Sequence, residues 1–137
     1  MDGAIKIFDV KKGKSILETQ SGSSARVGAL SWNNNLLSWS SDDNSITNRD
    51  VRCPQGASDF IFRGHSAEVC GLKWSHDGSY LASGGNDNRL FVWSLKKRAE
   101  VARLTGHTAA IKALAWSPHQ RNVLASGGGT SDKTIKF

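Results

Sequence analysis

The stretch Gly64–Trp93, GHSAEVCGLKWSHDGSYLASGGNDNRLFVW, recurs in the rest of the chain. When it is moved forward by 42 residues, its Gly-His opening falls on Gly106-His107, and Trp74 falls on Trp116. When it is moved back by the same distance, Trp74 falls on Trp32. A fixed period of about 40–45 residues indicates a protein that is built from repeated structural units.

The pattern within each repeat is typical of short antiparallel strands. Apolar runs alternate with clusters of glycine, asparagine, aspartate and serine, and no amphipathic helical period is found. A repeat of this length with a Gly-His opening and a closing tryptophan is typical of the WD40 blade, a four-stranded unit of β-propellers. The sequence therefore predicts an all-β fold, an incomplete WD40 β-propeller of about three blades plus fragments.

The repeat divides the chain into four segments. We expect the end of a preceding blade in residues 1–10, a degenerate blade in 11–50, a complete blade in 51–94, and a blade truncated before its closing tryptophan in 95–137. Within the repeats, the predicted strands include these five: Val27–Trp32, Leu36–Ser41, Phe60–Phe62, Val69–Trp74 and Ile111–Trp116.

Four polar or aromatic residues recur at fixed positions, and we predict that they form a structural network within each blade. The complete set is His65, Ser83, Asp87 and Trp93. The imidazole can join the carboxylate to the hydroxyl, and the hydroxyl can accept the indole N–H, so that every buried polar group is paired. The last repeat keeps His107, Ser126 and Asp132 but lacks the tryptophan.

The degenerate repeat departs most from this set. Ser23 takes the place of the histidine, Trp39 takes the place of the serine, and Arg49 takes the place of the closing tryptophan. Asp43 keeps the aspartate position. Because only Asp43 of the network remains, we expect blade stability to fall in the order complete repeat, last repeat, degenerate repeat. A bulky indole next to a missing histidine should also cost packing.

Composition sets limits on the class of protein. The chain has 137 residues, with 18 lysines and arginines against 12 aspartates and glutamates, a formal charge of +6. This charge suits acidic partners without requiring them. Cys53 and Cys70 form neither a disulfide framework nor a metal-binding motif, which favours the nucleus and cytoplasm. Since no apolar stretch approaches about 18 residues, we expect no membrane association.

Two kinds of reactive site can be considered and are not favoured. Serine, histidine and aspartate together suggest a hydrolase triad, but here they recur with the repeat and no nucleophile elbow is present. A zinc site made by His65, His107 and Cys70 is not expected, because the two histidines belong to different blades. We therefore predict no enzymatic activity, no metal and no cofactor.

Two further motifs suggest anion binding. Gly127-Gly128-Gly129-Thr130 resembles a phosphate-binding loop but lacks the Gly-Lys-Ser/Thr ending of a P-loop. We therefore interpret it as a tight turn whose glycines need positive φ. The basic turns Lys11–Lys14 and Lys96–Arg98 are interpreted as solvated hairpin tips. Nucleic-acid binding is not predicted, because no aromatic residues are interleaved with the charges.

Several longer motifs carry a more specific resemblance. They are ARVGALSW (25–32), EVCGLKWS (68–75), ASGGNDN (82–88), IKALAWSPHQ (111–120) and LASGGGTSD (124–132). Together they closely resemble the fizzy and fizzy-related coactivators of the anaphase-promoting complex, along almost the whole chain and in register. The segments IKALAWSPHQ and RDVR (49–52) look more like the fizzy-related branch.

The resemblance implies a function. In that family a seven-bladed propeller binds short degrons in substrate proteins and delivers them to the anaphase-promoting complex, a ubiquitin ligase. By resemblance, Asn86 and Thr130 match residues of the face that binds a Lys-Glu-Asn degron, and we expect them on one rim of adjacent blades. The alternative structural roles are an αL turn residue for Asn86 and a turn cap for Thr130. The alternative function is a WD40 interaction scaffold, or a diverged truncated copy, with no ligase role.

Overall fold

The computed structural model describes residues 3–20, 26–54 and 56–137. Every helix or strand element within these ranges is a β-strand, so the all-β prediction is confirmed. The strands are β1 (Ala4–Asp9), β2 (Lys14–Gln20), β3 (Leu30–Asn33), β4 (Leu36–Ser40), β5 (Ile46–Asp50), β6 (Phe60–Phe62), β7 (Val69–Trp74), β8 (Tyr80–Gly85), β9 (Leu90–Ser94), β10 (Ala99–Leu104), β11 (Ile111–Trp116), β12 (Leu124–Gly128) and β13 (Ile135–Lys136). Across the described ranges, no helix is long and apolar enough to cross a membrane.

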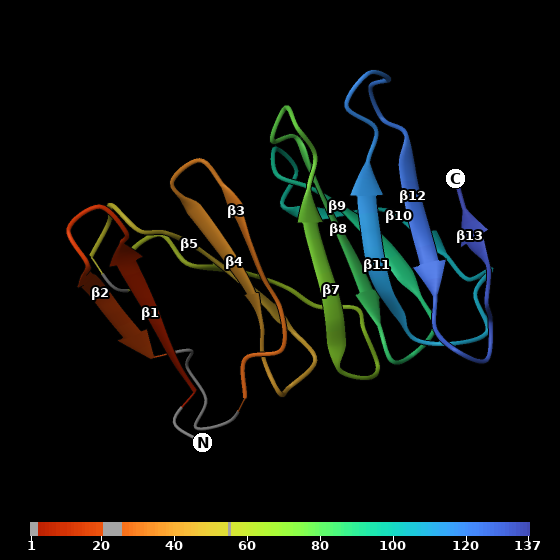
Figure 1. Cartoon of the computed structure of the whole chain (residues 1–137), viewed down its shortest axis with the longest axis horizontal. Coiled ribbons are helices and arrows are strands. Elements are labelled where there is room, and N and C mark those ends of the chain that lie inside the picture. Colours follow the sequence, from red (N-terminus) through yellow and green to blue (C-terminus); the bar gives the residue numbers. More distant parts are fainter. Residues whose placement is uncertain (1–2, 21–25, 55) are drawn as a thin grey trace.

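The strands form four antiparallel sheets that lie side by side (Figure 1). Their strand orders are β1-β2, β3-β4-β5-β6, β7-β8-β9-β10 and β11-β12-β13. The sheets are offset from the segments expected from the sequence. Strand β6, from segment 51–94, completes the second sheet, and β10, from segment 95–137, completes the third. Each repeat thus contributes its first strand to the sheet before it, which links neighbouring sheets.

Most strand limits agree with the sequence pattern, and β6, β7 and β11 match their predicted ranges. Strand β4 ends at Ser40 instead of Ser41, and β3 departs most, because it begins at Leu30 instead of Val27. The backbone N–H of Ala29 donates to the side-chain oxygen of Ser40 at 2.8 Å, and not to a backbone carbonyl. The backbone pairing is irregular here, since the N–H of Ser40 donates to the carbonyl of Ala29 at 3.0 Å and the N–H of Gly28 reaches the carbonyl of Ser40 only at 3.5 Å.

The turn between the second and third strand of each blade has a recurrent geometry. In three of the sheets the residue that follows the aspartate is left-handed: Asn44 (φ 66°), Asn88 (φ 63°) and Lys133 (φ 54°). In the third sheet, Oδ1 of Asp87 accepts the backbone N–H of Arg89 at 3.1 Å. The αL residue of this turn is therefore Asn88, and the αL role considered for Asn86 is wrong.

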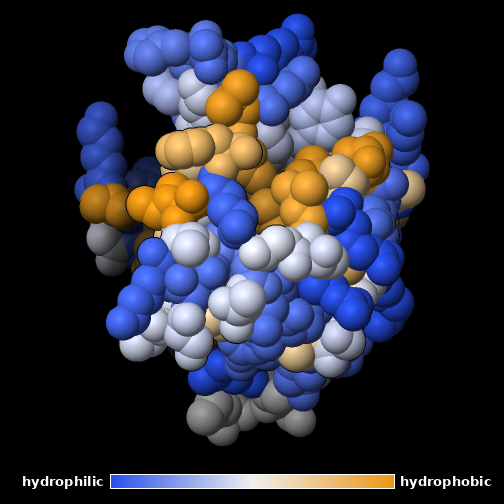
Figure 2. Space-filling model, turned by 90° about the vertical axis from the view of Figure 1, so that its right-hand side faces the viewer, coloured by the Kyte–Doolittle hydropathy of each residue, from blue (hydrophilic) through white to orange (hydrophobic). Residues whose placement is uncertain are grey.

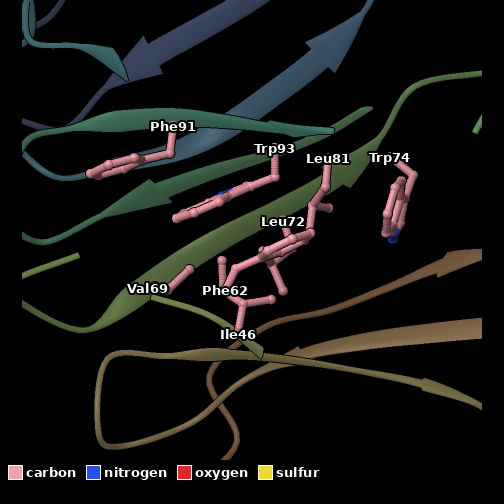
Figure 3. Packing of buried hydrophobic residues seen from close by; sticks show 8 residues of the cluster. All are labelled: Ile46, Phe62, Val69, Leu72, Trp74, Leu81, Phe91 and Trp93. Atoms are coloured by element: carbon pink, nitrogen blue, oxygen red, sulfur yellow. The ribbon is translucent and has the colours of Figure 1, made fainter. Parts of the chain in front are cut away.

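The apolar core lies between the sheets. Figure 3 shows Ile46 and Phe62 of the second sheet facing buried side chains of the third. The Phe62 and Trp93 rings stack with centroids 4.8 Å apart, and Phe91 stacks on the same indole at 5.2 Å. Smaller clusters join the first sheet to the second and the third sheet to the fourth. Because each core is shared by two sheets, the stability of one blade depends on its neighbours.

The fourth sheet packs against the third on one side only. Figure 2 shows a band of apolar surface on the side of the molecule where the fourth sheet lies. Exposed apolar residues of this region include Leu104, Ile135 and Phe137, the last with 94% of its surface accessible. A hollow of ≈ 460 Å³ between the third and fourth sheets is lined partly by Val101, Leu104 and Phe137.

Candidate functional site

The predicted polar network of the third sheet has its four members in contact. Nδ1 of His65 lies 3.0 Å from Oδ2 of Asp87, and Nε2 lies 2.8 Å from the hydroxyl of Ser83. The indole N–H of Trp93 donates to the same hydroxyl at 2.8 Å. The side chains of His65 and Asp87 are 1% and 4% exposed, so the network is closed to solvent.

The donors and acceptors of this network fix the protonation of the imidazole. The hydroxyl of Ser83 accepts from Trp93, and it can then donate its own proton to Nε2 of His65. Asp87 accepts from Nδ1–H on the other side of the ring. Every polar group is paired only if His65 is neutral. Burial lowers the pKa of His65 against the opposing effect of Asp87, which agrees with this assignment.

Asp87 has a second role in the turn between β8 and β9. Burial acts to raise its pKa, but hydrogen bonds from the backbone N–H of Ser66, from the backbone N–H of Arg89 and from His65 together lower that pKa. The N–H of Ser66 donates to Oδ2 at 3.0 Å. The carboxylate thus joins the loop before β7 to the turn after β8.

The lowered pKa of His65 predicts a pH dependence of stability. As the pH falls below about 6.5, the ordinary value for histidine, the unfolded chain takes up this proton before the folded chain does. The free energy of unfolding should therefore decrease from pH 7 towards pH 5. We expect His65→Gln to be less stable at pH 7 and to show a flatter dependence in urea titrations. His119→Gln, which alters an exposed histidine, should keep the wild-type slope. An equal slope in His65→Gln and the wild type would contradict this assignment.

The fourth sheet has the same arrangement without the tryptophan. Nε2 of His107 lies 2.8 Å from the hydroxyl of Ser126, and Nδ1 contacts Oδ2 of Asp132.

The adjacent glycines do not have the predicted positive φ, so that interpretation of Gly127–Gly129 is wrong. At Gly128 a close approach requires glycine instead. A Cβ atom at the equivalent Gly85 would lie 2.7 Å from the imidazole, and one at Gly128 would collide with Asp132.

The second sheet contains a different hydrogen-bond network that the sequence pattern did not reveal. The hydroxyl of Ser38 donates to Oδ1 of Asn48 at 2.6 Å, and it accepts the indole N–H of Trp74 from the neighbouring sheet at 2.9 Å. Ser38 and Asn48 align with Ala82 and Val92 of the third sheet, so this network lies beside the serine position and does not reproduce the His–Ser–Asp–Trp set. Ser23, the residue at the histidine position, lies outside the described residues.

The substituted residues of the second sheet also compensate one another. Trp39 pairs with Thr47 as Ser83 pairs with Phe91, which places the indole at the serine position as predicted. The indole is fully buried, and the guanidinium of Arg49 lies 5.1 Å from its ring centroid.

The geometry of the histidines bears on the reactive sites considered above. Because the hydroxyl of Ser83 is fully buried and engaged by two partners, a substrate carbonyl has no path to it. His65 and His107 belong to different sheets, and each contacts its own aspartate. Within the described residues no group of three or more His, Cys, Asp and Glu side chains could hold a metal ion.

The two residues predicted for peptide binding lie at one edge of the row of sheets. Asn86 is in the turn between β8 and β9, and Thr130 is in the turn between β12 and β13, both at the bottom of Figure 1. Both residues are exposed. Among the described residues, no hydrogen bond is formed by the Thr130 side chain, and the turn is closed by backbone bonds from Asp132 and Lys133 to Gly129. The basic turn Lys96–Arg98 lies at the opposite edge.

Next to Asn86 is a pocket of ≈ 440 Å³ that the sequence analysis did not identify. It is lined by Arg26, Val27, Gly28, Glu68, Cys70, Asn86 and Lys112. Gly28, Cys70 and Lys112 stand at the same position in three successive repeats, 42 residues apart, as do Arg26 and Glu68. This spacing was the signal in the sequence that could have predicted the pocket, since equivalent positions of successive blades lie close together in the fold. Burial, more than the Lys112 charge, sets the pKa of the Cys70 thiol and raises it.

Comparison with known proteins agrees with the repeat geometry. Residues 56–94 and 98–137 match the family model "WD domain, G-beta repeat". The chain belongs to the WD40-repeat family. Along 98% of its length it is 50% identical to FIZZY-RELATED 2 of Arabidopsis thaliana and 51% identical to the B-type cell cycle switch protein ccs52B of Medicago truncatula. It is also 48% identical to the anaphase-promoting complex subunit cdc20 of Dictyostelium discoideum. These matches confirm the resemblance to the fizzy and fizzy-related proteins.

A solved structure gives the same relationship in three dimensions. The WD40 chain superimposes with a TM-score of 0.89 and 45% identity on a chain in a crystal structure of the mitotic checkpoint complex. The match covers 98% of this chain and 40% of that one, and it confirms the partial propeller. The chain spans 28% of FIZZY-RELATED 2 and 27% of the Dictyostelium protein.

Proposed function

We propose that this WD40 chain is the degron-binding part of an adaptor that brings substrate proteins to the anaphase-promoting complex and activates it. Its partners would be subunits of that complex and proteins that carry short degrons. It would act in the nucleus and cytoplasm as a binding protein, with no cofactor and no enzymatic step of its own. The similarity to fizzy-related proteins along 98% of the chain supports this family of functions.

One structural observation carries the proposed site. Asn86 is exposed, and its turn takes its αL residue from Asn88 and its side-chain hydrogen bond from Asp87. The turn itself therefore does not require an amide at position 86, and no described residue donates a hydrogen bond to its carbonyl oxygen. An amide offers a carbonyl oxygen to a ligand N–H, and a hydroxyl such as that of Thr130 can donate and accept. This pair suits the lysine and backbone of a Lys-Glu-Asn degron.

The test is the affinity of the chain for a Lys-Glu-Asn peptide, measured by calorimetry or fluorescence anisotropy. We expect Asn86→Ala plus Thr130→Ala to weaken binding by about tenfold or more, since each lost hydrogen bond is worth about 1 kcal/mol. Ser131→Ala removes a neighbouring exposed hydroxyl and should bind as the wild type does. Unchanged affinity in the double variant would remove these residues from the site and favour a WD40 scaffold of other function.

A further inference from the structure

Glu68 makes both main-chain and side-chain contacts with Asn86. It lies in the loop before β7, and its backbone carbonyl accepts the N–H of Asn86 at 2.8 Å. Its carboxylate oxygen Oε2 lies 3.5 Å from Nδ2 of Asn86, at the long end of the range for a hydrogen bond. Glu68 thus holds both the backbone and the side chain of this residue from the neighbouring loop.

The contact with a carboxylate fixes the orientation of the Asn86 amide. An ionised carboxylate only accepts hydrogen bonds, so the NH₂ group must face Glu68 and the carbonyl oxygen Oδ1 must face away. Among the residues that the structure describes, none donates a hydrogen bond to Oδ1 of Asn86. Asn86 therefore presents a free acceptor at the edge where peptide binding is proposed.

Glu68 is held in turn from the second sheet. Arg26, in the segment before β3, donates from Nη2 to Oε1 of Glu68 and forms an ion pair with it. The same carboxylate oxygen packs beside Gly28, where a Cβ atom would lie 3.2 Å from Oε1. The two carboxylate oxygens therefore have separate functions: Oε1 binds the neighbouring blade, and Oε2 faces Asn86.

We propose that Glu68 is a positioning residue that orients the Asn86 amide for peptide recognition, and that Arg26 anchors Glu68 across the blade interface. This inference rests on the proposed degron site and adds its selectivity: the site accepts an N–H donor of the peptide at Oδ1 of Asn86. Lys112 lines the same pocket as Asn86 and Glu68.

The first experiment needs no peptide. The side-chain NH₂ resonances of Asn86 are followed by NMR in the full chain. Glu68→Ala should shift these resonances towards those of a solvent-exposed Asn amide, because the acceptor for Nδ2 is lost. Glu100→Ala breaks a surface ion pair with Arg103 elsewhere and should leave them unchanged. Unchanged Asn86 resonances in Glu68→Ala would overturn the inference, whatever the peptide does.

The second experiment separates positioning from a simple ion pair. We expect Glu68→Ala to weaken binding of the Lys-Glu-Asn peptide by about fivefold to tenfold, and Glu68→Gln to retain most of the affinity, since its side-chain oxygen can still accept from Asn86. The double variant Arg26→Glu plus Glu68→Arg restores opposite charges across the blade interface. Its melting temperature should therefore be close to that of the wild type. Its affinity should stay low, because a guanidinium has no acceptor for the amide NH₂.

The outcomes of these two experiments are distinct. Recovery of affinity in the charge-swapped variant, or an undiminished affinity in Glu68→Ala, would overturn the positioning role and leave only a structural ion pair. Failure of the wild-type chain to bind the peptide would instead overturn the proposed degron site. In the Asn86→Ala background, Glu68→Ala should cause no further loss of affinity. If Glu68→Ala weakened binding there as much as it does in the wild type, the inference would also be overturned.

Discussion

Replacing Trp93 by alanine is expected to lower the free energy of unfolding by about 3–5 kcal/mol, the usual range for a buried tryptophan. The indole is 2% exposed and stacks between Phe62 of the second sheet and Phe91 of the third. Its removal leaves a cavity at a core shared by two sheets and leaves the hydroxyl of Ser83 without one of its partners. Urea unfolding followed by circular dichroism measures the loss.

Two control variants separate packing from hydrogen bonding at Trp93. Trp93→Phe keeps an aromatic ring in the stack but removes the indole N–H, so we expect a loss of about 1 kcal/mol plus a packing term. Trp32→Ala removes an indole that is 49% exposed, and its effect should be much smaller than that of Trp93→Ala. Equal losses for the alanine variants of Trp93 and Trp32 would show that the shared core does not hold the sheets together.

Replacing Asp59 by alanine should cost the second sheet about 3 kcal/mol, because it leaves a buried cation without its anion. Nε of Arg49 donates to Oδ1 of Asp59 at 2.8 Å, and Nη2 donates to Oδ2 at 2.5 Å. The Arg49 side chain is buried, and the guanidinium lies against the fully buried ring of Trp39. Thermal unfolding of Asp59→Ala, compared with the wild type, tests this expectation.

The matched control is the exposed pair of Arg103 and Glu100, whose charges are solvated. Glu100→Ala should change the melting temperature far less than Asp59→Ala. A loss in Glu100→Ala as large as that in Asp59→Ala would contradict a special role for the buried pair. The bidentate pair with Asp59 also gives the second sheet a stabilising contact that our order of blade stability, argued from the members of the polar network, did not include.

The predictable part of the structure is the part set by spacing along the chain. The repetition of His65, Ser83 and Asp87 as His107, Ser126 and Asp132, after 42, 43 and 45 residues, identified the polar network, because the strands of successive blades have similar lengths. The positions of Asn86 and Thr130 in corresponding turns followed from the same spacing. Local repeats of this kind need no knowledge of contacts between distant segments.

The parts that were missed depend on contacts between blades or on substituted partners. The ion pair of Arg26 with Glu68 joins two loops whose approach depends on the angle between sheets. The hydrogen bond from Trp74 to Ser38 crosses from one blade to another. The sequence analysis explained Gly128 by a positive φ, whereas its lack of a side chain makes room for the carboxylate of Asp132.

The most direct test of the central claim is hydrogen exchange of the full chain with and without a Lys-Glu-Asn peptide. The account predicts slower exchange of backbone amides in the β8–β9 turn and the β12–β13 turn, at the edge that carries Asn86 and Thr130. A peptide with the same residues in permuted order should give no protection. Protection confined to the opposite edge, at the turn Lys96–Arg98, or no protection with either peptide, would contradict the account.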